Sequence, residues 1–138
     1  MLYVAIDQHA KQITVAIRDD QGEDVLKRQV STRPEKIKEF FDRLVAMDSE
    51  FMAILESCGF NDWLIEELRN RDCREIVLIH PERPSKKKTD RRDAHKLCVL
   101  LWLNRQRLAE GKPFHGLRRI YIATQDERFD RQFTSLRQ

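Results

Sequence analysis

The chain has 138 residues, of which 41% are hydrophobic and 36% are charged, and its net charge is +3. This length fits one domain with a real core, and the composition excludes a disordered or fibrous protein. No run approaches the roughly 20 apolar residues of a membrane span, and the first residues lack the pattern of a signal peptide. We therefore expect a cytoplasmic domain with at most one active site and no membrane partner.

The first part of the chain predicts three strands in succession. Residues 2–6 form an apolar run typical of a buried central strand, and Asp7 follows where that strand meets solvent. Residues 13–17 alternate between apolar and polar side chains, as a second strand does. After the turn-like residues 19–22 we expect a third strand around residues 25–30. Three antiparallel strands in sequence form a meander.

A helix and a further strand are expected next. Pro34 suits the first turn of a helix that Ser31 or Thr32 would cap. Apolar residues then recur at helical spacing, namely Ile37, Phe40, Phe41, Leu44 and Val45. Residues 51–55 predict another buried strand, and Glu56 stands at its carboxyl end. Gly59 then breaks the chain before a second helix.

The remaining elements complete the order βββαβαβα. Residues 75–79 predict a fifth strand, and a long helix is expected from about residue 90 to residue 108. That helix is apolar on more than one face, so we expect something beyond the sheet to cover it, such as a second copy of the chain. We assign residues 1–110 to one domain and residues 111–138 to a tail, with a possible short strand at residues 120–122.

Acidic residues stand at the ends of several predicted elements. Asp7 and Glu56 end strands, and Asp90 and Asp93 lie one helical turn apart, where residues share a helix face. If the first and fourth strands are neighbours, the four acids converge. Clustered carboxylates repel one another unless cations neutralise them, and oxygen ligands of this kind suit Mg²⁺ or Mn²⁺. Two such ions are the usual solution for phosphodiester chemistry, so the pattern predicts phosphoryl transfer on nucleic acid.

Each of these features also has an ordinary structural explanation. An acid after a strand is common in α/β folds, and acids at the start of a helix interact favourably with its dipole. A basic run lies beside the predicted acids and consists of Lys86, Lys87, Lys88, Arg91 and Arg92. Charge runs are usually solvated, but this position favours nucleic-acid binding through phosphate contacts. His9 lies close enough to Asp7 to line the site.

Three blocks of the sequence resemble the DEDD insertion-sequence transposases, which are related to the Piv and MooV recombinases. The first block is residues 4–11, VAIDQHAK, and the second is residues 54–59, ILESCG. The third and most specific block is His80-Pro81 followed by residues 88–94, KTDRRDA, which is similar to the K-T-D-x-x-D-A signature of the family. Order and spacing agree across roughly residues 2 to 105.

The resemblance implies an RNase H-like (RuvC-like) α/β fold, in which helices flank a mixed sheet. It implies that Asp7, Glu56, Asp90 and Asp93 are catalytic and bind Mg²⁺ or Mn²⁺, with two ions expected. The implied activity is metal-dependent cleavage and exchange of DNA strands in transposition and recombination. DNA is the expected partner, together with an element-encoded guide RNA and with other copies of the chain in a homodimer or higher oligomer.

The sequence also departs from the family pattern. Members continue into a helical hairpin and a second domain that supplies a serine nucleophile, whereas this chain ends at Gln138. Ser135 does not lie in that context, so the role is not transferred to it. The loop between Pro81 and Thr89 is short for the family. We therefore expect a transposase catalytic domain that is incomplete by itself.

Two other classes of protein stay open. A non-catalytic module for nucleic-acid binding or oligomerisation would use the basic run and the apolar helix, and its affinity would survive loss of the acids and fall with salt. An actin-like or sugar-kinase fold also begins with a strand and an Asp. However, residues 8–11 contain none of the glycines that a phosphate-cradling turn normally uses.

Overall fold

The computed structural model describes residues 1–81, 93–116 and 118–122. Within them the predicted order βββαβαβα is confirmed, and a short helix and a short strand follow it. The elements are β1 Leu2–Gln8, β2 Gln12–Arg18, β3 Asp24–Ser31, α1 Pro34–Met47, β4 Phe51–Glu56, α2 Asp62–Asn70, β5 Glu75–Ile79, α3 Ala94–Leu103, α4 Arg105–Ala109 and β6 Arg119–Ile120.

The strands of the described residues form one mixed sheet in the order β3-β2-β1-β4-β5-β6. β1 pairs with β2 in the antiparallel direction and with β4 in the parallel direction, and β4 and β5 are also parallel. Parallel central strands are buried on both faces, which explains why Val4, Ala5 and Ile6 have no exposed surface. The α/β, RNase H-like mixed sheet predicted from the sequence is confirmed.

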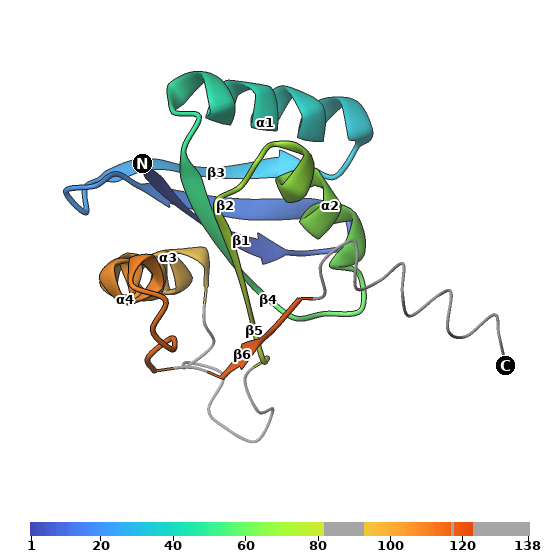
Figure 1. Cartoon of the computed structure of the whole chain (residues 1–138). Helices are drawn as coiled ribbons and strands as arrows, with labels where there is room; N and C mark the ends of the chain where they lie inside the picture. The colour runs from blue at the N-terminus through green and yellow to red at the C-terminus, as the bar shows by residue number, and fades with distance from the viewer. Residues whose placement is uncertain (82–92, 117, 123–138) are drawn as a thin grey trace, which may run out of the picture.

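Helices cover the sheet on both faces, with α1 and α2 on one side and α3 and α4 on the other (Figure 1). Side chains of a strand alternate between faces, so each strand contributes to two core layers. Val4, Ile6 and Leu55 pack with the α1 and α2 side chains. Ala5 and Ile54 pack on the opposite face with α3. This alternation decides which face the acids at the strand ends occupy.

The residue that precedes α1 differs from the prediction. The N-cap is Arg33, without a side-chain capping bond, and neither Ser31 nor Thr32 takes that role. Ser31 is the last residue of β3, and its Oγ accepts a bond from the backbone N–H of Arg33 at 3.3 Å. The hydroxyl of Thr32 instead donates to the carbonyl of Ala10, 3.2 Å away. The Thr32 hydroxyl therefore joins the end of β3 to the β1–β2 loop, while the Ser31 hydroxyl makes only a local bond.

The long helix predicted for residues 90–108 is wrong at its start and in its middle. α3 begins at Ala94, because Asp93 has an extended backbone with φ −94° and ψ 177°. α3 also ends at Leu103, and a separate helix, α4, follows Asn104. The buried amide of Asn104 donates to the carbonyls of Leu100 and His115, at 2.8 and 3.1 Å. Asn104 thereby ties the segment at His115 to the carboxyl end of α3.

The segment after α4 lies beside α3, since a Cβ added at Gly116 would lie 3.9 Å from Cδ2 of Leu100. Phe114 is only 9% exposed and belongs to the same core layer as α3. Trp102 lies near the carboxyl end of α3, and the backbone of Gly22 in the β2–β3 turn packs directly against its ring. Leu103 stays 61% exposed in the single chain. One part of the apolar surface is therefore still open.

Part of the segment assigned to a tail belongs to the sheet. β6 pairs with β5 in the antiparallel direction, with Ile120 opposite Leu78. Arg119 adds an ion pair with Glu75 of β5. The strand at Arg119–Ile120 is close to the one predicted for residues 120–122.

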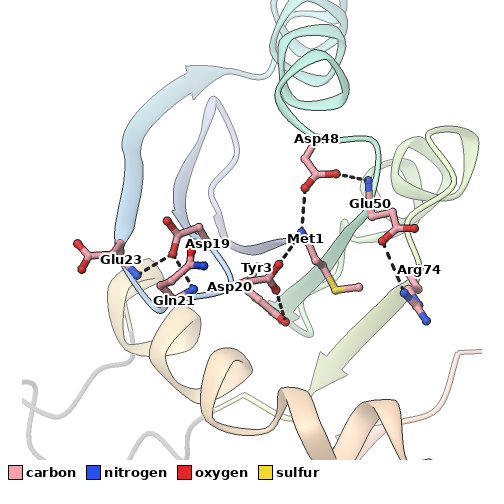
Figure 2. Close-up of polar contacts among 9 residues, drawn as sticks. All are labelled: Met1, Tyr3, Asp19, Asp20, Gln21, Glu23, Asp48, Glu50 and Arg74. Carbon is pink, nitrogen blue, oxygen red and sulfur yellow. Dashed lines mark hydrogen bonds and ion pairs between the residues drawn. The ribbon is translucent and has the colours of Figure 1, made fainter.

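A group of polar contacts holds the other end of β1, far along the strand from Asp7 (Figure 2). The amino-terminal ammonium of Met1 lies 3.0 Å from an Asp20 carboxylate oxygen and 2.8 Å from one of Asp48. The Tyr3 hydroxyl donates to the other oxygen of Asp20 at 3.1 Å. These contacts join β1 to the β2–β3 turn and to the segment before β4.

Across the described residues, no helix has the length and apolar character to cross a membrane.

Candidate functional site

Asp7 and Glu56 leave neighbouring parallel strands at the same level. In the register of β1 and β4, Ile6 is opposite Leu55, and each acid is the next residue of its strand. Alternation places Asp7 on the face of Ala5 and Glu56 on the face of Ile54, which is the face that α3 covers. Both acids are partly exposed. The predicted pairing of these two strand ends is therefore present in the structure.

His9 contacts the first of these acids. Its Nε2 lies 3.2 Å from Oδ2 of Asp7, and the exposed fractions of the two side chains are 40% and 24%. Residues two apart in an extended segment lie on the same face, which explains how the ring reaches the carboxylate. His9 thus lines the site, as the sequence predicts, and fixes one oxygen of Asp7.

The loop after Glu56 is tied to the end of β1 by two side-chain amides. Asn61, which is only 6% exposed, donates from Nδ2 to Oε1 of Gln8 at 2.8 Å and to the carbonyl of Glu56 at 3.3 Å. Its Oδ1 accepts the backbone N–H of Cys58 at 2.5 Å. Gln8 in turn donates from Nε2 to the carbonyl of Phe60 at 2.6 Å. The two strand ends and the loop form one hydrogen-bonded unit.

Asp93 occupies a capping position. Its Oδ1 accepts the backbone N–H of Lys96 at 2.9 Å, which is the usual N-cap bond of a helix. That bond lowers the pKa of the Asp93 carboxyl, and the charge of Lys27 lowers it further. The prediction that Asp93 lies within a helix and shares its face with Asp90 is wrong for Asp93, because an extended N-cap residue is not part of the helix.

The structure does not assemble the whole predicted site. Over residues 1–81, 93–116 and 118–122, no three His, Cys, Asp or Glu side chains come close enough to share a metal ion. Asp93 therefore does not form such a group with Asp7 and Glu56. Several predicted residues lie outside the described ranges, namely Asp90, Lys86, Lys87, Lys88, Arg91 and Arg92. Convergence of the four acids stays a prediction.

The described acids nevertheless have the right chemistry for a hard divalent cation. Asp7 and Glu56 supply carboxylate oxygens from adjacent strands, and such oxygens are the preferred ligands of Mg²⁺ and Mn²⁺. Mg²⁺ is commonly held by one or two carboxylates and keeps several waters. Two partly exposed acids on a rigid sheet fit this mode of binding.

Sequence reasoning missed Asn61 and the bonding role of Gln8. In the sequence, Gln8 stands out only as part of the first block and as a non-glycine residue after Asp7. Asn is a frequent residue at helix starts, and Asn61 precedes α2, so its position has a sequence signal. Its side chain, however, bonds to the preceding loop instead of capping the helix. The partner that the Asn61 side chain takes depends on the pairing of β1 with β4, which brings Gln8 next to it.

Comparison with known families assigns the protein to a class. The family model for DEDD transposases of the IS110 type, described as "Transposase", matches residues 4–117. This match covers most of the chain and includes both strand-end acids. The protein belongs to this transposase family, which acts in DNA transposition and generally uses divalent metal ions.

Other comparisons add little. A search of curated proteins finds no match. Among solved structures, the Ppx/GppA phosphatase of Aquifex aeolicus, a type II variant, is similar with a TM-score of 0.35 and 15% sequence identity. That alignment covers 59% of this chain and 36% of the phosphatase, so the chain spans about a third of its length.

Proposed function

We propose that this chain is the metal-dependent catalytic domain of a transposase, and that Asp7, Glu56, Asp90 and Asp93 bind the ions used to cleave and join DNA strands. The observation that carries the proposal is the parallel register of β1 and β4, which places Asp7 and Glu56 side by side at strand ends. Family membership supplies the substrate class. The domain would work together with a carboxyl-terminal part that provides further catalytic groups.

Each residue has a distinct part in the proposed reaction. Asp7 and Glu56 would bind the divalent cation from the sheet, and His9 would orient Asp7 through its 3.2 Å contact. Asp93 would contribute from the amino end of α3, while its Oδ1 keeps the capping bond. Bound Mg²⁺ or Mn²⁺ supplies activation of the attacking oxygen and stabilisation of the leaving oxygen at phosphorus. The basic run would hold the DNA backbone beside the acids.

Calorimetric titration with Mn²⁺ tests the proposal, both for the protein alone and with a short duplex DNA. Asp7→Asn and Glu56→Gln each remove one anionic ligand, and each should weaken Mn²⁺ binding at least tenfold. Asp90→Asn tests the third block in the same way. Glu35→Gln is the control, because it removes the same charge from an exposed position on α1, across the sheet from α3.

The outcomes separate the proposed function from its main alternative. Equal Mn²⁺ affinity in the wild type and in Asp7→Asn contradicts a metal site at this sheet edge. If Asp7→Asn also keeps the wild-type DNA affinity, and neither it nor the wild type cleaves DNA, the chain is a non-catalytic nucleic-acid-binding module. Selective loss of Mn²⁺ binding in the acid variants, with Glu35→Gln unchanged, supports the catalytic domain.

The partners follow from the same proposal. DNA is the substrate, an element-encoded RNA would guide its choice, and a homodimer or higher oligomer would bring two DNA ends together. The exposed Leu103 of α3 supports an interface between copies of the chain, because large exposed apolar residues on an apolar helix are typical of such surfaces.

A further inference from the structure

We infer that Gln8 and Asn61 are positioning residues that hold Asp7 and Glu56 at the spacing needed to bind one divalent cation. This inference rests on the proposed function of these acids. Gln8 directly follows Asp7 in β1, and Asn61 bonds to the backbone of Glu56 in β4. The bond between the two amides, 2.8 Å long, therefore joins the residue that follows Asp7 to a residue that is itself bonded to the backbone of Glu56. We call this pair of amides the clamp.

The orientation of both amides is fixed by their backbone partners. The N–H of Cys58 can only donate, so Oδ1 of Asn61 must face it. The carbonyl of Phe60 can only accept, so Nε2 of Gln8 must face it. The remaining groups, Nδ2 of Asn61 and Oε1 of Gln8, are then a matched donor and acceptor. A flip of Gln8 would break its bonds to Phe60 and Asn61, and a flip of Asn61 would break its bonds to Cys58, Gln8 and Glu56, so the clamp has one stable arrangement.

The clamp links the ends of β1 and β4 directly, beyond their last ladder pair. Pairing between β1 and β4 extends to Ile6 and Leu55, one residue before the acids. Asp7 and Glu56 are still paired on their outer sides, with Thr14 of β2 and Ile79 of β5. The clamp therefore supplies a direct link between the two acid-bearing ends at the point where the β1–β4 ladder stops. Hydrogen-bond partners of metal ligands typically change metal affinity by ten- to a hundredfold, and the clamp, which acts through the backbone beside the ligands, is expected at the lower end of this range.

Burial supports a role beyond a surface contact. Asn61 is 6% exposed, and its amide uses both N–H groups and its oxygen in bonds. Polar side chains that are buried and fully bonded rigidify the backbone that they touch. Here that backbone is the last residue of β4 and the loop directly after it. The clamp thus stiffens one side of the site without occupying a ligand position.

The test compares Gln8→Ala, Asn61→Ala and the double variant with the wild type. Phe60→Ala is the matched control, since it changes an exposed side chain in the same loop and keeps the carbonyl that Gln8 bonds. Mn²⁺ affinity is measured by calorimetry well below the melting temperature of every variant. We expect about a tenfold loss in each single variant, no further loss in the double variant, and the wild-type value for Phe60→Ala. Additive losses, or affinity within twofold of the wild type in folded Gln8→Ala, overturn the inference.

A second measurement does not depend on the metal. Amide hydrogen exchange at Cys58 reports the bond to Asn61, and Gln8→Ala should accelerate it because Asn61 loses the partner that orients it. An unchanged exchange rate at Cys58 in Gln8→Ala would contradict the inference that Gln8 holds Asn61 in place. If the wild type binds no Mn²⁺ but the exchange accelerates, the proposed function fails while the clamp stands as the element that holds the two strand ends. The two failures are therefore distinguishable.

Discussion

Oδ1 of Asp93 accepts a hydrogen bond from the backbone N–H of Lys96, so one carboxylate oxygen of a proposed metal ligand also starts α3. Two substitutions separate these roles. Asp93→Ala removes the cap and should cost about 1 kcal/mol of stability, whereas Asp93→Asn keeps a good capping oxygen and should cost little. Both should weaken Mn²⁺ binding if Asp93 is a ligand. Urea unfolding and Mn²⁺ calorimetry, run on the same samples, decide whether Asp93 has one role or two.

The same hydrogen bond predicts that the stability of the folded protein depends on pH in the acidic range. The pKa of Asp93 is lowered in the folded protein, chiefly by the N–H of Lys96, so its contribution to stability is present above the unfolded pKa near 3.8. The contribution is lost as the pH falls below that value and through the folded pKa. Asp93→Asn, which does not titrate, should lose less stability than the wild type as the pH falls below 3.8. Identical acid profiles of the two proteins would exclude this contribution.

A second pH dependence arises at the opposite end of β1. Bonds to Asp48 and Asp20 raise the pKa of the Met1 ammonium above 8.0. A raised pKa contributes stability that is complete below 8.0 and is lost as the pH rises through the folded value. The urea midpoint of the wild type should therefore fall above pH 8. Asp20→Asn combined with Asp48→Asn should flatten this fall, and an unaltered alkaline profile would contradict the contribution of the ammonium (Figure 2).

Gly22 is required by its backbone and by its neighbour. Its φ is +80°, and a Cβ added there would lie 2.7 Å from Cζ2 of Trp102. Gly22→Ala should cost roughly 2–4 kcal/mol, from the strained φ and from displacement of the ring. Gly111→Ala isolates the first effect, since its φ is +72° and no atom lies within 4 Å of the added Cβ. Gly59→Ala meets neither problem. Thermal unfolding should rank the losses as Gly22 above Gly111 above Gly59.

The basic run is expected to bind DNA through phosphates. Replacing Lys86, Lys87 and Lys88 with Gln should weaken binding to unrelated duplexes equally and reduce the slope of log affinity against log salt by about 1 for each phosphate that is no longer neutralised. Replacing Lys36, Lys38 and Arg43 of α1 with Gln removes the same charge from a helix outside the three sequence blocks and is the control. Fluorescence anisotropy at several salt concentrations measures both slopes. Equal slopes for the two triple variants would assign the effect to net charge alone.

Leu103 tests the predicted self-association. It is 61% exposed on the most apolar helix of the described chain. Leu103→Glu should shift a dimer to a monomer in sedimentation velocity while leaving the melting temperature of the monomer nearly unchanged, because surface substitutions usually change stability by less than about 0.5 kcal/mol. A wild-type protein that is monomeric at every accessible concentration would contradict the prediction.

Sequence patterns predicted the sheet well because its strands are encoded locally. Residues 2–6 and 51–55 are continuous apolar runs that end at acids, and both positions are confirmed as neighbouring parallel strand ends. The break at Asn104 was missed, since it depends on bonds to Leu100 and to His115 eleven residues later. The bond between Gln8 and Asn61 was missed for the same reason, because it links residues 53 positions apart.

The pairing of β5 with β6 has a consequence for how this protein tolerates change. The N–H of His80 donates to the carbonyl of Arg118 at 2.9 Å, so the chain that leaves the sheet after β5 returns to the same point. The connection between these residues has two fixed ends, and within it α3 packs on the sheet. The entropy of closing a loop rises only slowly with its length. Changes in the length of this connection that leave α3 in place should therefore be tolerated, while Asp7 and Glu56 keep their positions at the strand ends.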